Sequence, residues 1–427
     1  MMDKRMIPGN QDKDSIVDLA ARYVCPGRVD TFKMLGTVPV MGRREGNYFW
    51  DIDGRRLFDV HINGGTYNLG HRNPEITSTL REAIDYYDIG NHHFPSVARA
   101  RLAEELIRIT PGDMHYCVFT PGGAEAIDVT IRTARRVTGR RKIVAFREAY
   151  HGHGSLGLRA GGYEKLARFF LSERPKGEFI LVPFNEPEAM GEALKGGDVA
   201  AVLCEMIPAT SGFLMPSDGY FKNVKKLCEE HGTLFIADEV QTGLGRTGRY
   251  WACQGYGIEP DMLVTGKGLS GGIYPIAAAV LSKDVAGWLK EDGWGYSSTF
   301  GGSELGCVIA HKVLEITGRP GVLENVRAMS EFLGNALGKI QGRHPFLVEI
   351  RQNGLVIGLR TDDPHGGLML AACCYESGLW AFPAGFERSV LQFKPNILVD
   401  RPACEEALSL LEDAVRLCEK KFLKKKS

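Results

Sequence analysis

Short apolar runs alternate with amphipathic stretches through the middle of the chain. Two of these stretches, 125–138 and 220–231, place apolar side chains at helical spacing. Seven near-continuously hydrophobic runs are predicted to be strands: 115–120, 142–146, 179–183, 200–205, 234–238, 262–265 and 275–281. Runs that are hydrophobic at almost every position are typical of a parallel sheet covered by helices on both faces. We therefore expect an α/β fold with a mainly parallel central sheet.

The two ends of the chain show a different pattern. Before residue 65, turns and polar strands predominate, as in the segment 46–54. After residue 320 come a long predicted helix at 322–342, further strands, and a final helix at 402–422. A chain of 427 residues exceeds the usual size of a single hydrophobic core. We therefore expect a large domain at 66–318, and a smaller α+β domain built from 1–65 and 319–427.

Charge and cysteine usage limit the classes of protein to which this chain can belong. Lys plus Arg and Asp plus Glu both total 52, so nothing indicates a nucleic-acid or membrane partner. No apolar run reaches the roughly 20 residues of a membrane-spanning helix, and no apolar segment follows the first residues as in a secretory signal. The ten cysteines are scattered without a CxxC pair, which favours free thiols in a reducing compartment. We expect a cytoplasmic protein whose basic stretch at 419–426 is a solvated helix end.

Two short motifs between residues 236 and 272 compete with the interpretation that we favour. The GxGxxG pattern at 243–248 follows a predicted strand, but Gly255 soon interrupts the helix that a dinucleotide site needs. The GxSxG pattern at 268–272 leads into another strand, whereas a nucleophile elbow turns directly into a helix. We therefore disfavour a dehydrogenase and a serine hydrolase.

An acid and an amine end two consecutive strands of the predicted sheet. Asp238 ends the run Leu-Phe-Ile-Ala-Asp, and Lys267 follows the next run. In a parallel sheet both side chains emerge at the carboxyl edge, where ligands bind. Pyridoxal phosphate needs such a pair, a lysine for its aldehyde and a carboxylate for its ring nitrogen. Upstream, Gly122, Gly123 and Ala124 open a helix after a strand, an arrangement that favours a phosphate.

These residues lie in segments that resemble the class III (ornithine/omega) aminotransferases, a family of fold type I pyridoxal phosphate enzymes. The resemblance covers about residues 46–399. It is strongest in the run Asp-Glu-Val-Gln-Thr-Gly-Leu-Gly-Arg-Thr-Gly at 238–248. The remaining segments that carry it are 68–71, 146–152, 265–272 and 298–302. The resemblance implies an aminotransferase that moves an amino group from a primary amine to a keto acid.

The resemblance also implies roles for residues around the cofactor ring. Lys267 forms a Schiff base with the aldehyde and, once released, carries a proton between substrate and cofactor. Asp238 pairs with the pyridinium nitrogen, and Tyr150 stacks on one face of the ring. Gln241 lies near the phenolic oxygen. Glu205 lies next to these cofactor-contacting residues, one layer further from the ring. All of these roles are expectations carried over from matching positions.

A further set of implied residues concerns the phosphate and the assembly. Gly122, Gly123 and Ala124 hold the phosphate, and Thr299 reaches it from a neighbouring subunit, which implies a homodimer. The His pairs at 151 and 153 and at 92 and 93 have no further ligand set beside them. We therefore expect no metal site.

One position departs from the family. Gln392 stands where many members have an arginine that binds the substrate carboxylate. A neutral amide cannot supply bidentate, charge-assisted pairing. One hypothesis is that the substrate amine lacks a neighbouring carboxylate, as in a polyamine, an amino alcohol or an amino sugar. The alternative is that Lys394 or Arg388 binds another anion and that the enzyme is a phospho-lyase or ammonia-lyase, a decarboxylase or an epimerase.

Overall fold

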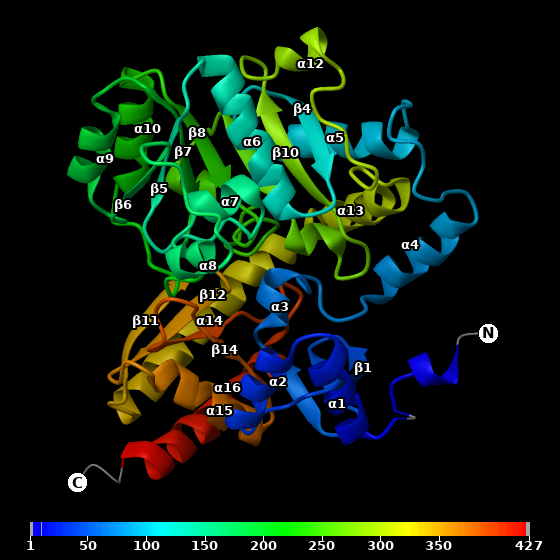
Figure 1. Cartoon of the computed structure of the whole chain (residues 1–427). Helices are drawn as coiled ribbons and strands as arrows, with labels where there is room; N and C mark the ends of the chain where they lie inside the picture. Colours follow the sequence, from blue (N-terminus) through cyan, green and yellow to red (C-terminus); the bar gives the residue numbers. More distant parts are fainter. Residues whose placement is uncertain (1–2, 10, 424–427) are drawn as a thin grey trace.

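The computed structural model describes residues 3–9 and 11–423. The middle of the chain, cyan to green in Figure 1, forms the upper part of the molecule around one sheet. Both ends of the chain, blue and orange to red, form the lower part. No helix among the described residues is long and apolar enough to cross a membrane. The boundaries 66–318, 1–65 and 319–427 stay a prediction.

The central sheet has seven strands in the order β4-β10-β9-β8-β7-β5-β6. They are β4 (Met114–Thr120), β5 (Lys142–Phe146), β6 (Phe179–Val182), β7 (Val199–Glu205), β8 (Leu234–Asp238), β9 (Met262–Thr265) and β10 (Ala277–Ser282). Neighbouring strands from β6 to β9 pair in parallel, whereas β10 is antiparallel to both β9 and β4. The seven predicted strands and the mainly parallel sheet are confirmed.

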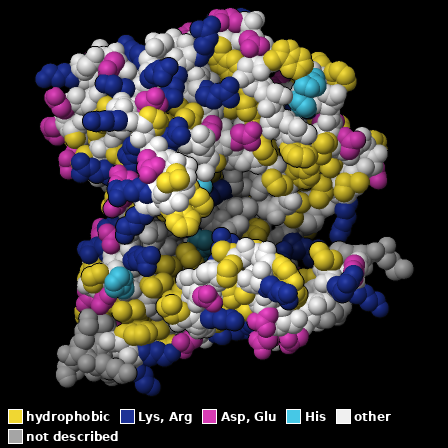
Figure 2. Space-filling view, viewed as in Figure 1, with side chains coloured by type: hydrophobic (Ala, Val, Ile, Leu, Met, Phe, Trp, Pro, Cys, Tyr) yellow, Lys and Arg dark blue, Asp and Glu magenta, His cyan; other side chains and the backbone are white. Residues whose placement is uncertain are grey.

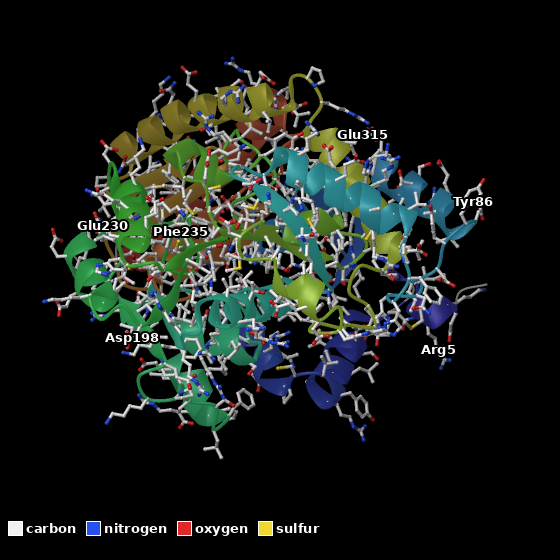
Figure 3. The ribbon with its side chains drawn as sticks, turned by 90° about the horizontal axis from the view of Figure 1, so that it is seen from above. Arg5, Tyr86, Asp198, Glu230, Phe235 and Glu315 are labelled. Atoms are coloured by element: carbon white, nitrogen blue, oxygen red, sulfur yellow. The ribbon has the colours of Figure 1, made fainter. Side chains whose placement is uncertain are left out.

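Helices cover both faces of this sheet because successive strand residues point to opposite sides. Ile143 packs in the same core as α6 (Gly123–Thr138), on one face. Val144 points to the opposite face of the sheet and packs in the hydrophobic core there. That face carries α5 (Val97–Ile109), α9 (Pro187–Leu194), α10 (Tyr220–Glu230) and α13 (Glu304–Thr317). Figure 3 shows Phe235 of β8 inside the molecule, surrounded by these layers. The hydrophobic strands are therefore buried on both sides, as their sequence predicts.

The chain ends build two smaller sheets. One has the order β1-β2-β3-β13 and the other the order β11-β12-β15-β14. The first contains β1 (Met41–Glu45), β2 (Tyr48–Asp51), β3 (Arg56–Asp59) and β13 (Leu379–Trp380), and the second β11 (Leu347–Asn353), β12 (Val356–Thr361), β14 (Phe382–Pro383) and β15 (Val390–Phe393). Because β13 pairs in parallel with β3, residues near both ends share one sheet.

The other helices connect or cover these sheets. They are α1 (Lys13–Tyr23), α2 (Pro26–Met34), α3 (Ile62–Gly65), α4 (Pro74–Ile84), α7 (Ser155–Ala160), α8 (Glu164–Phe169), α11 (Ala252–Tyr256), α12 (Trp288–Glu291), α14 (Val322–Arg343), α15 (Gly366–Ser377) and α16 (Arg401–Cys418). The final helix is shorter than predicted, because α16 ends at Cys418 and a wider turn follows over Glu419–Leu423. Residues 424–426 of the basic stretch lie outside the described residues.

Candidate active site

A cavity lies at the carboxyl edge of the central sheet. Glu205 ends β7, Asp238 ends β8, and Lys267 follows β9 after one intervening glycine. These three strands are parallel neighbours, so their carboxyl ends meet at one edge. All three side chains line the cavity, together with Gly123, Ala124, Tyr150, His151 and Gln241. The structure thus brings together side chains that are separated by more than a hundred positions in the sequence.

Lys267 occupies an unusual backbone conformation at this edge. Its φ is +39°, in the left-handed region that is costly for a residue with a side chain. Its Nζ lies 5.9 Å from the centre of the Tyr150 ring. Burial lowers the pKa of Lys267, and the carboxylates of Asp238 and Glu205 act in the opposite direction. A lysine with a lowered pKa is a better nucleophile and proton acceptor near neutral pH.

Glycine at position 64 makes room for the Lys267 side chain. A Cβ at Gly64 would lie 3.3 Å from Lys267 Cε and 3.7 Å from Gln241 Oε1. Its φ of +67° is also a conformation that glycine adopts readily. Lys267 and Gln241 therefore lie side by side across this glycine.

Asp238 is held by two hydrogen bonds within the protein. Its Oδ1 accepts from the Val240 backbone N–H at 3.0 Å, and its Oδ2 pairs with His151 Nδ1 at 2.8 Å. Both side chains are buried. The sequence analysis missed the role of His151, although the residue is part of the segment at 146–152. These contacts orient the carboxylate so that it remains a hydrogen-bond acceptor at the cavity wall.

Glu205 lines the cavity and accepts hydrogen bonds from two backbone segments. Its Oε1 accepts from the Tyr150 backbone N–H at 2.9 Å, and its Oε2 accepts from the Ala209 N–H at 3.1 Å. Burial raises the pKa of Glu205, and nearby Asp238 raises it further, whereas His151 and the two N–H donors lower it. Glu205 therefore fixes the segment that carries the Tyr150 ring.

The N-terminus of α6 faces the same cavity. Gly122 is the residue before the helix and has no side chain to cap it, and Gly123 and Ala124 line the cavity. The first backbone N–H groups of a helix lack partners within the helix and attract anions. A Cβ at Gly152 would lie 2.5 Å from the Ala124 Cβ, so the loop approaches this helix closely. The three small residues leave room for a phosphate.

Gln392 and Lys394 lie beneath the cavity wall and do not line it in this structure. Both are buried on or just after β15, with exposed fractions of 6% and 0%. Lys394 Nζ donates to Gln241 Oε1 at 2.7 Å and to Gln392 Oε1 at 2.8 Å. Arg388 is exposed on the loop before β15. The structure thus links two of the predicted substrate residues to the cofactor-facing Gln241.

Thr299 is a predicted cofactor residue that is exposed and does not line the cavity. It lies exposed in the segment after α12. The neighbouring side chains Trp294 and Phe300 are 67% and 58% exposed. The ring centres of Trp294 and His93 lie 4.6 Å apart in a tilted arrangement, which joins this segment to the connection between α4 and α5. Within one chain, Thr299 therefore contributes nothing to the cavity.

Comparison with known proteins identifies the family. The model of the class III aminotransferases matches residues 34–415, and the chain belongs to this family. An uncharacterized aminotransferase from Archaeoglobus fulgidus is 45% identical, over 97% of this chain and 96% of that protein. An acetylornithine aminotransferase from Rhodobacter capsulatus is 32% identical, over 88% and 95%. The taurine:2-oxoglutarate aminotransferase structure from Bifidobacterium kashiwanohense, solved with pyridoxal phosphate and glutamate, is 25% identical, with a TM-score of 0.86 over 96% and 99%.

The chain is therefore a fold type I enzyme that uses pyridoxal phosphate and transfers amino groups between small-molecule amines and keto acids. The comparisons support this reaction and give no support to the elimination, decarboxylation or epimerisation weighed above. The groups at the cavity fit the cofactor: a half-buried amine, an oriented carboxylate and an uncapped helix N-terminus. The family prediction and the cofactor prediction are confirmed.

Proposed function

We propose that Lys267 attaches the cofactor as a Schiff base at Nζ and that Asp238 holds the ring nitrogen protonated. The observation that carries this proposal is the meeting of both groups on one cavity wall, with His151 fixing the carboxylate. When bound, pyridoxal phosphate supplies an electron sink for the bond that breaks at the substrate carbon. The amine of Lys267 takes the proton from that carbon and passes it to the cofactor, a task that suits its lowered pKa.

The remaining residues of the cavity bind and orient. The Tyr150 ring, near Lys267 Nζ, packs against one face of the cofactor ring, and its backbone is held by Glu205. The backbone N–H groups of Gly123 and Ala124 at the start of α6, after Gly122, hold the phosphate. Gln241 donates to the phenolic oxygen.

The amino donor that we propose lacks a carboxylate beside its amine. Gln392 stands at the position in question: its amide oxygen accepts from Lys394, and its Nε2 donates to the Ala209 carbonyl at 2.8 Å. An amide in these hydrogen bonds carries no charge and cannot form the bidentate pairing that an arginine offers to a carboxylate. Direct contact of Gln392 or Lys394 with substrate stays a prediction, and their burial favours an indirect effect.

The experiment that tests this function follows the visible absorbance of the purified holoenzyme as a panel of amines is added without any keto acid. A donor converts the yellow form to the pyridoxamine form without release of free ammonia, and a keto acid restores the yellow form. If instead the yellow form persists while ammonia accumulates, the reaction is an elimination. A protein that takes up no pyridoxal phosphate contradicts the proposal.

The active enzyme that we propose is a cytoplasmic homodimer. Figure 2 shows apolar side chains gathered on the right of the upper part, and Figure 3 shows Tyr86 projecting at the periphery. The exposed apolar side chains near Thr299, at the end of α4, before and in α5 and after α12, are Ile84, Tyr86, Ile89, Phe94, Val97, Trp294 and Phe300. Such a concentration of apolar residues favours an interface between subunits. The ten free cysteines favour the reducing cytoplasm.

Hybrid dimers test whether Thr299 serves the neighbouring active site. We expect Lys267→Ala and Thr299→Ala homodimers to be impaired for different reasons. In a hybrid, one site combines an intact Lys267 with an intact Thr299 from the partner subunit. Co-refolding the two variants therefore restores part of the activity. If the mixture is no more active than the sum of its parts, Thr299 does not act across an interface.

A further inference from the structure

Lys394 lies directly behind one wall of the cavity. Its Nζ is within hydrogen-bonding distance of two amide oxygens, Gln241 Oε1 at 2.7 Å and Gln392 Oε1 at 2.8 Å. The same Nζ lies 5.2 Å from the centre of the Phe213 ring. The side chain is 0% exposed. This lysine is thus fully buried and donates to two amide oxygens within the protein, which argues against its use as an open anion site.

From Lys394, a series of hydrogen bonds continues through Gln392 to the backbone of Tyr150. Gln392 Nε2 donates to the Ala209 carbonyl at 2.8 Å. The Ala209 N–H donates to Glu205, whose second oxygen accepts from the Tyr150 N–H. One series of hydrogen bonds therefore joins residues after β8, on β15 and after β7. The series begins at Gln241 on one side of the cavity and ends at Tyr150 on the other.

The lysine fixes which way the Gln241 amide is turned. Lys394 Nζ donates to Gln241 Oε1, so the amide of this glutamine presents its oxygen to the lysine. The N–H groups of the same amide then point away from Lys394. Gln241 itself lines the cavity, and its Oε1 lies close to the Cβ position of Gly64 that also touches Lys267. With the amide so turned, its N–H donors are available on the cavity side.

Burial and the charged groups around Lys394 together determine the direction in which its pKa is shifted. Burial lowers the pKa of Lys394 well below its usual value, and the positive charges of Arg246 and Lys267 lower it further. Asp59 acts in the opposite direction. His61 faces both lysines, and their charges depress its own pKa in addition to burial. Keeping a lysine in this setting is costly, so its hydrogen bonds must serve the fold or the site.

We propose that Lys394 is a positioning residue that holds the Gln241 amide with its N–H groups toward the phenolic oxygen of pyridoxal phosphate. The inference rests on the proposed function in one respect, namely that Gln241 donates to this oxygen. A donor stabilises the anionic oxygen, and this favours loss of the proton from the Schiff base nitrogen beside it. Lys394 therefore sets, through Gln241, the pH at which the bound cofactor changes its absorbance.

The test is a pH titration of the visible absorbance of the holoenzyme, without substrate. Three variants are compared with the wild type: Lys394→Met, Gln241→Leu and the double variant. We expect each single variant to move the midpoint of the titration upward by about one pH unit, because the donor to the phenolic oxygen is lost. Because Lys394 acts through Gln241, the double variant has the same midpoint as Gln241→Leu.

Three results overturn the proposal. The first is an unchanged midpoint in Lys394→Met while Gln241→Leu shifts. The second is a shift in the double variant that equals the sum of the single shifts, which means that Lys394 acts by its own charge. The third is an equal shift in the control Thr361→Val. This control removes a buried hydroxyl that bonds within the same small sheet and touches neither glutamine.

A second variant covers the case in which Lys394→Met does not fold. Gln392→Leu removes one of the two oxygens that hold Lys394, so we expect a smaller upward shift, and an unchanged midpoint contradicts the proposal. The wild-type spectrum separates this inference from the proposed function. If Lys267 does not bind the cofactor, the wild type shows no visible band to titrate. If only the role of Lys394 is wrong, the wild-type band is normal and the variants do not move it.

Discussion

Lys267 and Lys394 lie on either side of Gln241, in two very different surroundings. Lys267 follows a strand of the central sheet, has a strained backbone and lines the cavity near Tyr150. Lys394 follows β15 of a small sheet, is fully buried, and donates to two amide oxygens. Burial lowers the pKa of both lysines. Their different contacts fit the different roles that we propose, since Lys267 lines the cavity and Lys394 donates to two amide oxygens behind it.

The comparison teaches that a lowered pKa does not identify a catalytic lysine. Desolvation acts on any buried amine, whatever it contacts. What separates the two residues is access to the cavity, which Lys267 lines and Lys394 does not. Asp238 and Glu205 act on Lys267, whereas Asp59 and the positive charges of Arg246 and Lys267 act on Lys394. The following predictions test that distinction, from the largest effect to the smallest.

Replacing Lys267 with Ala gives the largest effect. We expect turnover to fall by about 10³-fold or more, because covalent attachment and proton transfer at Nζ are both lost. The variant keeps some non-covalent affinity for pyridoxal phosphate, without the wild-type visible band. Steady-state kinetics and absorbance spectra measure both. Lys394→Met is the matched comparison and retains the band. Substantial residual turnover in Lys267→Ala would overturn the assignment.

Replacing Asp238 with Ala tests the carboxylate beside Lys267. We expect kcat to fall by about 10²-fold and cofactor affinity to weaken, because the ring nitrogen loses its charged partner. Kinetics and equilibrium dialysis with pyridoxal phosphate are the measurements. The control is Asp198→Ala, since Asp198 lies on the surface, far from the cavity, with Lys142 as its ion-pair partner (Figure 3). An unaltered rate in Asp238→Ala argues against the pyridinium role.

Lys394→Met changes the pH dependence of stability in the cofactor-free protein. The folded protein lowers the pKa of Lys394, so the unfolded chain binds more protons between that pKa and about 10.4. Stability from this group therefore rises with pH in that window, by at most about 1.4 kcal/mol per pH unit. We expect the variant to lose this slope, measured by urea unfolding over a series of pH values up to about 10. Equal slopes in both proteins contradict the buried setting of Lys394.

Gly64→Ala gives the smallest effect. The new Cβ approaches Lys267 Cε and adopts a strained φ, so we expect a few-fold loss of activity and about 1 kcal/mol of stability. Gly54→Ala is the control, because Gly54 has a φ of +85° and open space around its Cβ position. Thermal unfolding of both variants measures the shared backbone strain, and kinetics measures the contact with Lys267. Equal losses of activity in both variants would mean that the contact is unimportant.

Local sequence patterns were enough to predict the strands of the central sheet and the positions of Asp238 and Lys267 at its edge. Hydrophobic runs encode buried strands locally, and the residue that ends each parallel strand is bound to lie at the carboxyl edge. Asp238 and Lys267 could therefore be identified without coordinates. The class III motif then implied the roles of Tyr150, Gln241 and Glu205.

Only the tertiary structure decided which side chains meet across the chain. His151 reaches Asp238 over 87 positions, and Lys394 reaches Gln241 over 153 positions. Local patterns carry no information about such contacts, because they arise when separate elements pack. The same reason explains why Gln392, predicted to face substrate, lies beneath the wall, and why β13 joins β3 near the other end of the chain. Hydrophobic periodicity determines whether a segment forms a strand or a helix, whereas packing determines which side chains of other segments it contacts.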